Sequence, residues 1–284
     1  MSLSPGHPRE GSLPPGGKPR SANGTPARSG AGVGFLALLL VGWEVAARLS
    51  GAKAALFPPP SAVAATLVTM LADGRVFRPL AESMVRLALG YGAALVLAVG
   101  LGVSMGYSRI VYNLFEPLVE LARPIPKPAL VAPLIFFLGL GDVMKVTVVA
   151  LGVFFPILIN TIQGVRGLEP GYVETARTFG AGTASILRKI MLPAALPQIL
   201  AGMHISLGIG FVLVIIAEMI SADGGLGFAI VNAQRSFRVK EMYAWVVVLA
   251  ITGYAMNEMF LMLRTRLLHW HRDYDALERS AAQA

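Results

Sequence analysis

Ionisable and nucleophilic side chains inside apolar stretches are the residues of this chain best suited to chemistry. Glu44, Glu218 and Glu258 each interrupt such a stretch, and His204 lies two positions before Ser206 in another. Carboxylates within apolar helices are typical of proton or ion relays, and a histidine near a serine suggests a general base and a nucleophile. Residues two apart on a helix point to different sides, however, so packing and hydrogen bonding are favoured for His204 and Ser206.

Composition indicates what kind of protein holds these residues. Of the 284 residues, 55% are hydrophobic and only 14% are charged, and the mean hydropathy is +0.65. A soluble domain usually carries about 25% charged residues, so a soluble enzyme is excluded. Cysteine is absent, which excludes disulfides and thiolate metal sites, and no metal site is expected. The net charge of +8 fits basic loops at a membrane better than nucleic-acid binding.

Six apolar stretches predict membrane-spanning helices, which need about 20 residues each. They are residues 31–49, 87–108, 128–141, 146–165, 198–222 and 242–263. Six spans place both termini on one side, and with both inside, the cytoplasmic segments carry more Lys and Arg than the outer ones. The sequence therefore predicts an all-α integral membrane protein with both termini cytoplasmic. Gly102 and Gly106 form a small-xxx-small pair that predicts a helix-packing notch.

The regions outside the spans have distinct characters. Residues 1–30 are rich in Pro, Gly and Ser and cannot bury a core, so they predict a disordered cytoplasmic tail. The transmembrane domain is expected over 31–265, with a cytoplasmic C-terminal tail at 266–284. Residues 61–86 predict helices on the outer surface, the first with Ser61 as N-cap and the second running into the following span.

A proline cluster precedes the short third span, in the sequence Arg123-Pro124-Ile125-Pro126-Lys127. Each proline removes a backbone donor and disfavours helix in the residue before it. Irregular backbone at membrane depth survives only against protein or a water-filled cavity. The segment predicts either the cytoplasmic mouth of a transport pathway, where the basic residues would attract an anion, or a proline-stiffened loop. The candidate pathway or gate residues are Arg123, Pro124, Ile125, Pro126, Leu207 and Glu218.

The most informative segment, 163–193, lies in a predicted cytoplasmic loop. Glu174-Thr175-Ala176 is followed at fixed spacing by Gly180, Ile190 and Leu192-Pro193. Residues 172–179 can form a short helix with Glu174 near its positive N-terminus. Gly180 frees the turn after it, and residues 183–190 can form a second helix. This spacing resembles the coupling loop of ATP-binding-cassette (ABC) importer permeases, with Thr175 where alanine is usual.

The resemblance extends over roughly residues 35–270. Five further motifs are similar to the nitrate/sulfonate/taurine/bicarbonate branch of these permeases: residues 58–61, 123–126, 154–161, 217–220 and 224–227. The resemblance implies a type I ABC importer permease core with six transmembrane helices in the bacterial inner membrane. It also implies a second copy of the chain, two cytoplasmic ATP-binding subunits and an extracytoplasmic substrate-binding protein as partners, besides membrane lipid.

The same resemblance implies how the work is divided. The chain has no Gly-x-x-x-x-Gly-Lys-[Ser/Thr] phosphate loop, so ATP and Mg would be bound by the ATPase subunits and the chain itself would need no cofactor and catalyse nothing. A small, anionic solute such as a sulfonate, taurine, nitrate, bicarbonate or an aromatic acid would cross by alternating access. The implied ATPase-coupling residues are Glu174, Ala176, Arg177, Gly180, Ala181, Ile190 and Pro193.

Two other classes of function are weighed against this one. A secondary transporter or channel would use Glu218 and Glu258 as a relay, and an intramembrane hydrolase would use Ser206 with His204. The coupling-loop spacing argues against both. For Glu44 and Glu258 we expect hydrogen bonds between helices, whereas Glu218 fits either such a bond or a gate.

Overall fold

The computed structural model describes residues 27–50, 56–221 and 223–268, and every regular element in them is helical. Its elements, in chain order, are α1 (Ala27–Leu49), α2 (Pro60–Ala72), α3 (Phe77–Tyr107), α4 (Arg109–Ala122), the 3₁₀ turn η2 (Lys127–Leu130), α5 (Val131–Leu138), α6 (Asp142–Arg166), α7 (Pro170–Thr178), α8 (Thr183–Ile186), the π turn η3 (Leu187–Met191), α9 (Leu192–Ile220), α10 (Gly225–Arg235) and α11 (Val239–Leu267). The expected tails lie largely outside the described residues. Helix α1 begins inside the predicted N-terminal tail, and α11 continues past residue 266.

Four helices of the described chain are long and apolar enough to cross a membrane: α3, α6, Thr183–Ile220 and α11. A fifth candidate is the pair formed by α4 and the η2–α5 stretch, which is bent by 87°. The first predicted span corresponds to α1, a helix of 23 residues that is not among these. The predicted six spans are therefore confirmed for four and, if the bent pair counts as one, for five.

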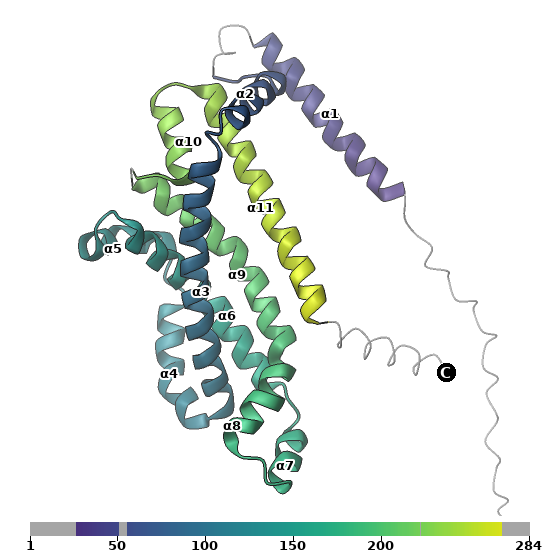
Figure 1. Ribbon diagram of the computed structural model, residues 1–284, viewed down its shortest axis with the longest axis vertical. Helices are drawn as coiled ribbons and strands as arrows, with labels where there is room; N and C mark the ends of the chain where they lie inside the picture. The colour runs from purple at the N-terminus through teal and green to yellow at the C-terminus, as the bar shows by residue number, and fades with distance from the viewer. Residues whose placement is uncertain (1–26, 51–55, 222, 269–284) are drawn as a thin grey trace, which may run out of the picture.

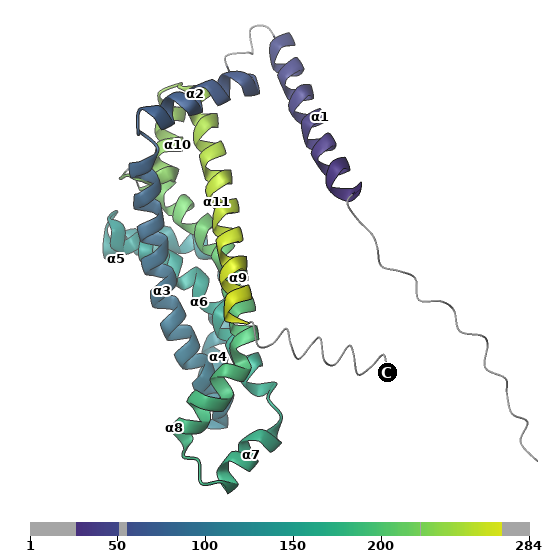
Figure 2. The same ribbon diagram turned by 45° about the vertical axis from the view of Figure 1, so that its right-hand side comes forward.

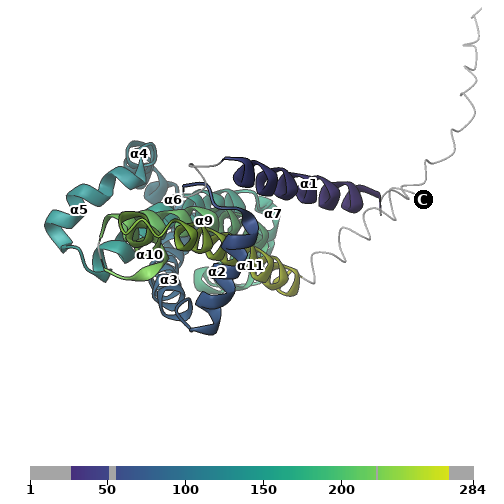
Figure 3. The same cartoon turned by 90° about the horizontal axis from the view of Figure 1, so that it is seen from above.

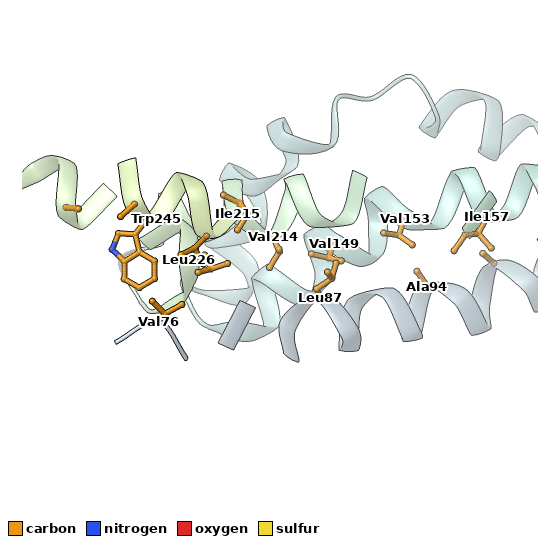
Figure 4. Packing of buried hydrophobic residues seen from close by; sticks show 14 of the residues in the cluster. Val76, Leu87, Ala94, Val149, Val153, Ile157, Val214, Ile215, Leu226 and Trp245 are labelled. Carbon is orange, nitrogen blue, oxygen red and sulfur yellow. The ribbon is translucent and has the colours of Figure 1, made fainter. Parts of the chain in front are cut away.

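Helices α3, α6 and α9 form the core of the bundle. α3 and α6 run parallel, and small residues at every fourth position of α3 let the two backbones approach closely. These residues are Gly90, Ala94, Ala98, Gly102 and Gly106. A Cβ at Gly102 would overlap Thr161, and one at Gly106 would overlap Val165, so the predicted packing notch is confirmed. Figure 4 shows part of this seam, with Ala94 facing Val153 and Ile157.

The two ends of the bundle carry different short helices. At one end, here named the α10 end, α2 crosses the starts of α3 and α11 beside α10, while α7 and α8 lie at the opposite end, the α7 end (Figures 1 and 2). α1 leans away from the bundle and meets α2 (Figure 3). The first predicted surface helix is confirmed as α2. The second is confirmed as the first part of α3, which continues into the predicted span at 87–108. Helix α10 was not predicted, because a segment starting with three glycines in four residues resembles a loop.

The third predicted span, residues 128–141, is wrong as a continuous helix. The chain rises along α3 as α4, a segment expected to be a loop, and then turns aside as α5 at mid-height (Figure 1). The turn follows from Pro124 and Pro126, which offer no N–H to continue α4 beyond Ala122. Gly139, with φ of 72°, ends α5. The stretch is therefore half of a broken span.

Candidate functional site

Helix α7 ends in a motif that requires glycine. The amide of Ala181 donates to the Ala176 carbonyl at 3.0 Å, and the amide of Gly180 donates to the Arg177 carbonyl at 2.9 Å. These two bonds are those of a Schellman motif, in which the residue after the C-cap is left-handed. Gly180 has a φ of 78° and takes that place. The predicted helix and glycine turn are thus confirmed, although Glu174 lies in the middle of α7 and not in its first turn.

The two faces of α7 differ. Val173 and Ala176 pack into a cluster with Val165, Ile186 and Met191, which fixes the helix against the bundle. A second side presents Tyr172 and Phe179, whose residues are 60% and 85% exposed. The exposed Glu174 points to a different side of the helix and lines a cleft beside it. Large apolar side chains that are left exposed together on one side of a helix are typical of a protein-binding surface. The geometry therefore supports docking of a partner at the α7 end.

One hydrogen bond links α7 to the end of α3. Nη2 of Arg177 donates to the Tyr107 hydroxyl oxygen at 3.2 Å. A polar cleft of about 730 Å³ opens next to this bond, with Arg109, Arg166 and Glu174 among its lining residues. A displacement of α7 would therefore also act, through this hydrogen bond, on α3, one of the core helices.

The rest of the predicted coupling segment joins α9. Residues 183–190 were expected as a separate surface helix, but Thr183–Ile220 is one helix with a π turn at Leu187–Met191. Pro193 follows this turn and has no N–H to offer the carbonyl of Lys189, so the helical ladder widens there. Ile190 lies in the turn, half-buried, and Pro193 is exposed. The second half of the coupling segment is therefore part of a membrane-crossing helix, and α7 joins that helix through the turn at Gly180.

The proline cluster lies at a different depth from the one expected. The ammonium of Lys127 sits 4.4 Å from the centre of the Phe155 ring, and Phe155 is near the middle of the 25-residue α6. Arg123, Pro124, Ile125 and Pro126 therefore lie halfway along the bundle, where α4 meets η2 (Figure 1). The expectation that this segment lies at the cytoplasmic mouth is wrong, because α4 carries it inward. Its role as a gate stays a prediction.

A buried ion network joins α3, α9 and the start of α10. Glu218 of α9 is 0% exposed and accepts hydrogen bonds from Nη1 of Arg86 and from the Ser83 hydroxyl, each at 2.8 Å. The amide of Gly227 donates to its other oxygen at 3.0 Å. Glu218 thus anchors three elements to one another. Its predicted place at a pathway or gate stays a prediction.

The network continues onto α6. Nε of Arg86 donates to Asp142 at 2.7 Å, and the fully buried Lys145 donates to the Asp223 carbonyl oxygen at 2.6 Å. Sequence reasoning missed this part, because it placed Arg86 at a helix end and Lys145 in a short outer segment between two spans. A signal was present in the sequence. Arg86 and Lys145 each directly precede an uncharged stretch. Both lie at the end of a span predicted to face outward, where basic residues are disfavoured. Acidic partners were therefore needed.

Side chains from other helices cap the N-terminus of α10. The amides of residues 225–227 donate in order to Glu82, Ser83 and Glu218, at 2.8, 2.9 and 3.0 Å. The first amides of a helix lack internal partners, and its dipole favours anions at this end. Gly225, with φ of 90°, lets the backbone approach the carboxylate, because a Cβ there would overlap Glu218.

The substitution Gly225→Ala is expected to lower the melting temperature of the purified protein. A left-handed backbone costs a residue with a Cβ about 1–2 kcal/mol, and the overlap with Glu218 adds to this. Gly208→Ala is the matched control, since Gly208 lies within α9 and a Cβ there meets nothing; alanine is favoured there by about 1 kcal/mol. Equal melting temperatures for the two variants would contradict the capping role of Gly225.

The other singled-out residues of α9 face different neighbours. His204 Nε2 lies 2.9 Å from Asn257 of α11, whereas the Ser206 hydroxyl donates to the Met203 carbonyl at 2.9 Å. The two do not meet, so the hydrolase hypothesis has no catalytic pair, and the expected packing and hydrogen bonding are confirmed. Leu207 packs near Phe260 of α11, apart from the proline cluster with which it was grouped.

Glu44 and Glu258 have different surroundings. Glu44 accepts hydrogen bonds from the amide and hydroxyl of Ser61 at 3.0 and 2.8 Å, so the expected bond between helices is confirmed. Ser61 is not the N-cap, because α2 begins at Pro60 and the cap comes from α1 instead. Glu258 is half-buried on α11, and its carboxylate has no hydrogen bond to the described residues, so the expected bond is not found. No cluster of described side chains could hold a metal ion.

Sequence matches to known proteins identify the family to which this chain belongs. Residues 94–267 match the family described as binding-protein-dependent transport system inner membrane component. The chain is 32% identical over 244 residues to the taurine transport system permease protein of Escherichia coli (strain K12), covering 84% of this chain and 89% of that protein. It is 30% identical over 239 residues to a protein of Bacillus subtilis (strain 168) that carries the name of an aliphatic sulfonates transport permease, covering 84% and 87%.

A solved structure shares the fold. An inward-facing conformation of the MetNI methionine ABC transporter superposes with a TM-score of 0.57 at 20% identity, covering 66% of this chain and 93% of the other. This likeness concerns the fold alone. The family match over residues 94–267 and the two relatives show that the chain belongs to the family of binding-protein-dependent transport system inner membrane components.

Proposed function

We propose that the chain is the permease of an ABC importer for a small, anionic solute, with a sulfonate or taurine first among the candidates. The observation that carries the proposal is α7, which leaves the apolar Tyr172 and Phe179 exposed on one side and Glu174 exposed on another, and which the turn at Gly180 joins to the helix that contains α9. The substrate class rests on relatives named for taurine and aliphatic sulfonates. Nitrate, bicarbonate and aromatic acids belong to the same chemical range.

The proposed assembly contains two copies of this chain, two cytoplasmic ATP-binding subunits that bind ATP and Mg, and an extracytoplasmic substrate-binding protein. In this assembly the α7 end faces the cytoplasm, as do both termini. The α4–α5 side leaves Phe136 and Phe137 90% and 85% exposed, which supports its burial against a second copy or lipid.

The proposed mechanism is alternating access. Closure of the ATP-loaded subunits would draw the two α7 segments together, and α9 and α3 would carry that motion along the bundle. The Arg86–Glu218 network makes the α10 end of α3, α6 and α9 one unit, so the helices would move as rigid levers. The binding protein would deliver solute at the α10 end, and ATP hydrolysis would reset the inward-open state.

The secondary-transporter hypothesis with Glu218 and Glu258 has no support in the structure or the relatives. Glu218 is occupied by Arg86, Ser83 and Gly227. The relatives from Escherichia coli and Bacillus subtilis are named as transport permeases, and the family is described as binding-protein-dependent.

Uptake by proteoliposomes tests the proposal. The chain is reconstituted with its ATP-binding subunit and binding protein, and uptake of labelled taurine, ethanesulfonate and nitrate is measured. We expect uptake of at least one solute that requires ATP and binding protein and that persists when ion gradients are collapsed. Uptake that follows an ion gradient and ignores ATP would establish the secondary transporter instead. No ATP-dependent uptake of any of the three would reject the proposed substrate class.

A further inference from the structure

The strongest unexplained feature is a cation at the middle of the broken span. Nζ of Lys127 donates to the carbonyl oxygens of Ala122 and Arg123 at 2.7 and 3.4 Å and lies over the Phe155 ring at 4.4 Å. The two carbonyls belong to the end of α4, whose dipole favours a cation. Lys127 has no carboxylate partner among the residues that the structure describes. A charge at this depth is costly and is usually functional.

A cleft lies next to this cation, although Lys127 is not itself among the residues that line it. The cleft has a volume of about 470 Å³ between α4 and α6, and it shares Tyr112 and Arg166 with the larger cleft beside α7. Its lining residue nearest to Lys127 in the chain is Arg123, whose carbonyl accepts from Lys127. The two clefts therefore extend from the surroundings of α7 to a residue in contact with Lys127.

The acidic and basic side chains that line the cleft are equal in number, and Lys127 is not among them. Glu120 lies 3.8 Å from Arg123. Glu116 accepts the Tyr112 hydroxyl at 2.6 Å, and the guanidinium of Arg166 covers the same Tyr112 ring at 3.5 Å. The two acids of the cleft are thus matched by two arginines. Lys127 adds a further positive charge next to Arg123, just beyond the residues that line the cleft.

The backbone holds this ammonium in place. Pro126 and Pro128 flank Lys127, and proline fixes φ and removes the donor that could rearrange the turn. The ammonium has three donors, of which two bond to the carbonyls of α4. The third makes no hydrogen bond to the described residues, although the ammonium lies over the Phe155 ring. The residue is half-buried, so part of it is accessible.

We propose that Lys127 is an anion-binding residue midway along the transport path, where its ammonium pairs with the charged oxygen atoms of a sulfonate, carboxylate or nitrate in transit. This assignment rests on the proposed function. It predicts that uptake depends on positive charge at position 127 more than on side-chain shape.

The absence of cysteine from the chain allows a charge-exchange experiment on one preparation. Lys127→Cys is assembled with the ATP-binding subunit and binding protein and treated with an aminoethyl or a sulfonatoethyl methanethiosulfonate. The two reagents add side chains of similar size and opposite charge. We expect the untreated variant to lose about tenfold or more of taurine, ethanesulfonate or nitrate uptake, as when a charged hydrogen bond is removed. Aminoethylation should restore uptake, and sulfonatoethylation should not.

Three controls accompany the experiment. The wild-type complex receives the same reagents, which measures their effect on the partner subunits. Lys240→Cys replaces an exposed cation of α11 and should transport normally with either reagent. Lys127→Arg keeps the charge and should retain most uptake, while ATP hydrolysis stimulated by the binding protein should persist in Lys127→Cys.

The outcomes separate the two proposals. If the wild-type complex carries none of the three solutes with ATP, the proposed function fails and the assignment fails with it. If the wild type carries one but Lys127→Cys carries it equally well, the proposed function stands and the assignment is overturned. Equal rescue by both reagents would also overturn it, because size and not charge would then matter at position 127.

Discussion

Arg86→Leu is expected to destabilise the protein by about 3–5 kcal/mol, the range for removing one partner of a buried ion pair. The variant leaves the fully buried Glu218 carboxylate with only the Ser83 hydroxyl and the Gly227 amide as partners. Asp142 loses its bond to Arg86 as well. The melting temperature of the detergent-solubilised protein measures the effect. Because α3, α6, α9 and the start of α10 share this network, we expect the α10 end to loosen before the rest of the α3–α6 seam.

A matched control lies two turns away on α3. Arg78 also bonds to a glutamate, Glu82, at 2.9 Å, but its side chain is 89% exposed, so Arg78→Leu should cost only about 0–1 kcal/mol. The double variant Arg86→Leu/Glu218→Leu should be less destabilised than the sum of the two single variants, because it leaves no unpaired buried charge. If Arg86→Leu melts no lower than Arg78→Leu, the network is not what holds this end together.

The parts that sequence reasoning predicted are those governed by local patterns. The notch at Gly102 and Gly106 could be predicted because helical periodicity places residues four apart on one face. The turn at Gly180 could be predicted because a left-handed C-cap favours glycine. Both patterns lie within a few residues of sequence, so no knowledge of the partner helix was needed.

The parts that were missed depend on contacts between distant segments. Asp142 and Glu218 are 56 and 132 residues from Arg86, and no spacing rule joins them. The depth of the proline cluster was wrong for a related reason. Residues 109–122 were expected to be a loop, and the amphipathic α4 instead carries Pro124 half a bundle inward. Helix α10 was missed because its first amides are capped by α3 and α9, which a local reading cannot include.

The docking surface is the second feature for which we expect a large effect. Glu174 is exposed on α7, on a different side of the helix from the exposed apolar residues Tyr172 and Phe179, and its side chain has no partner among the described residues. An unpaired, exposed charge is suited to a specific contact on another subunit, where reversal of the charge is repulsive. Glu174→Arg is therefore expected to lower substrate-stimulated ATP hydrolysis of the reconstituted complex by about tenfold or more, with normal insertion into the membrane.

Gly180→Trp tests the same surface through shape. With φ of 78° any side chain is strained there by about 1–2 kcal/mol, and the indole would also project into solvent, since nothing lies within 4 Å of a Cβ at this position. Gly180→Ala has the same backbone strain without the bulk, so it should keep most of the coupling while Gly180→Trp loses it.

Glu169→Arg is the charge control, because Glu169 is exposed in the same loop but precedes α7. If it uncouples hydrolysis as strongly as Glu174→Arg, the loop acts through net charge and not through a docked face. If Glu174→Arg and Gly180→Trp both hydrolyse ATP with wild-type stimulation, α7 does not bind the ATPase. The cleft beside it, with Arg109 and Arg166, would then be the next surface of the α7 end to test.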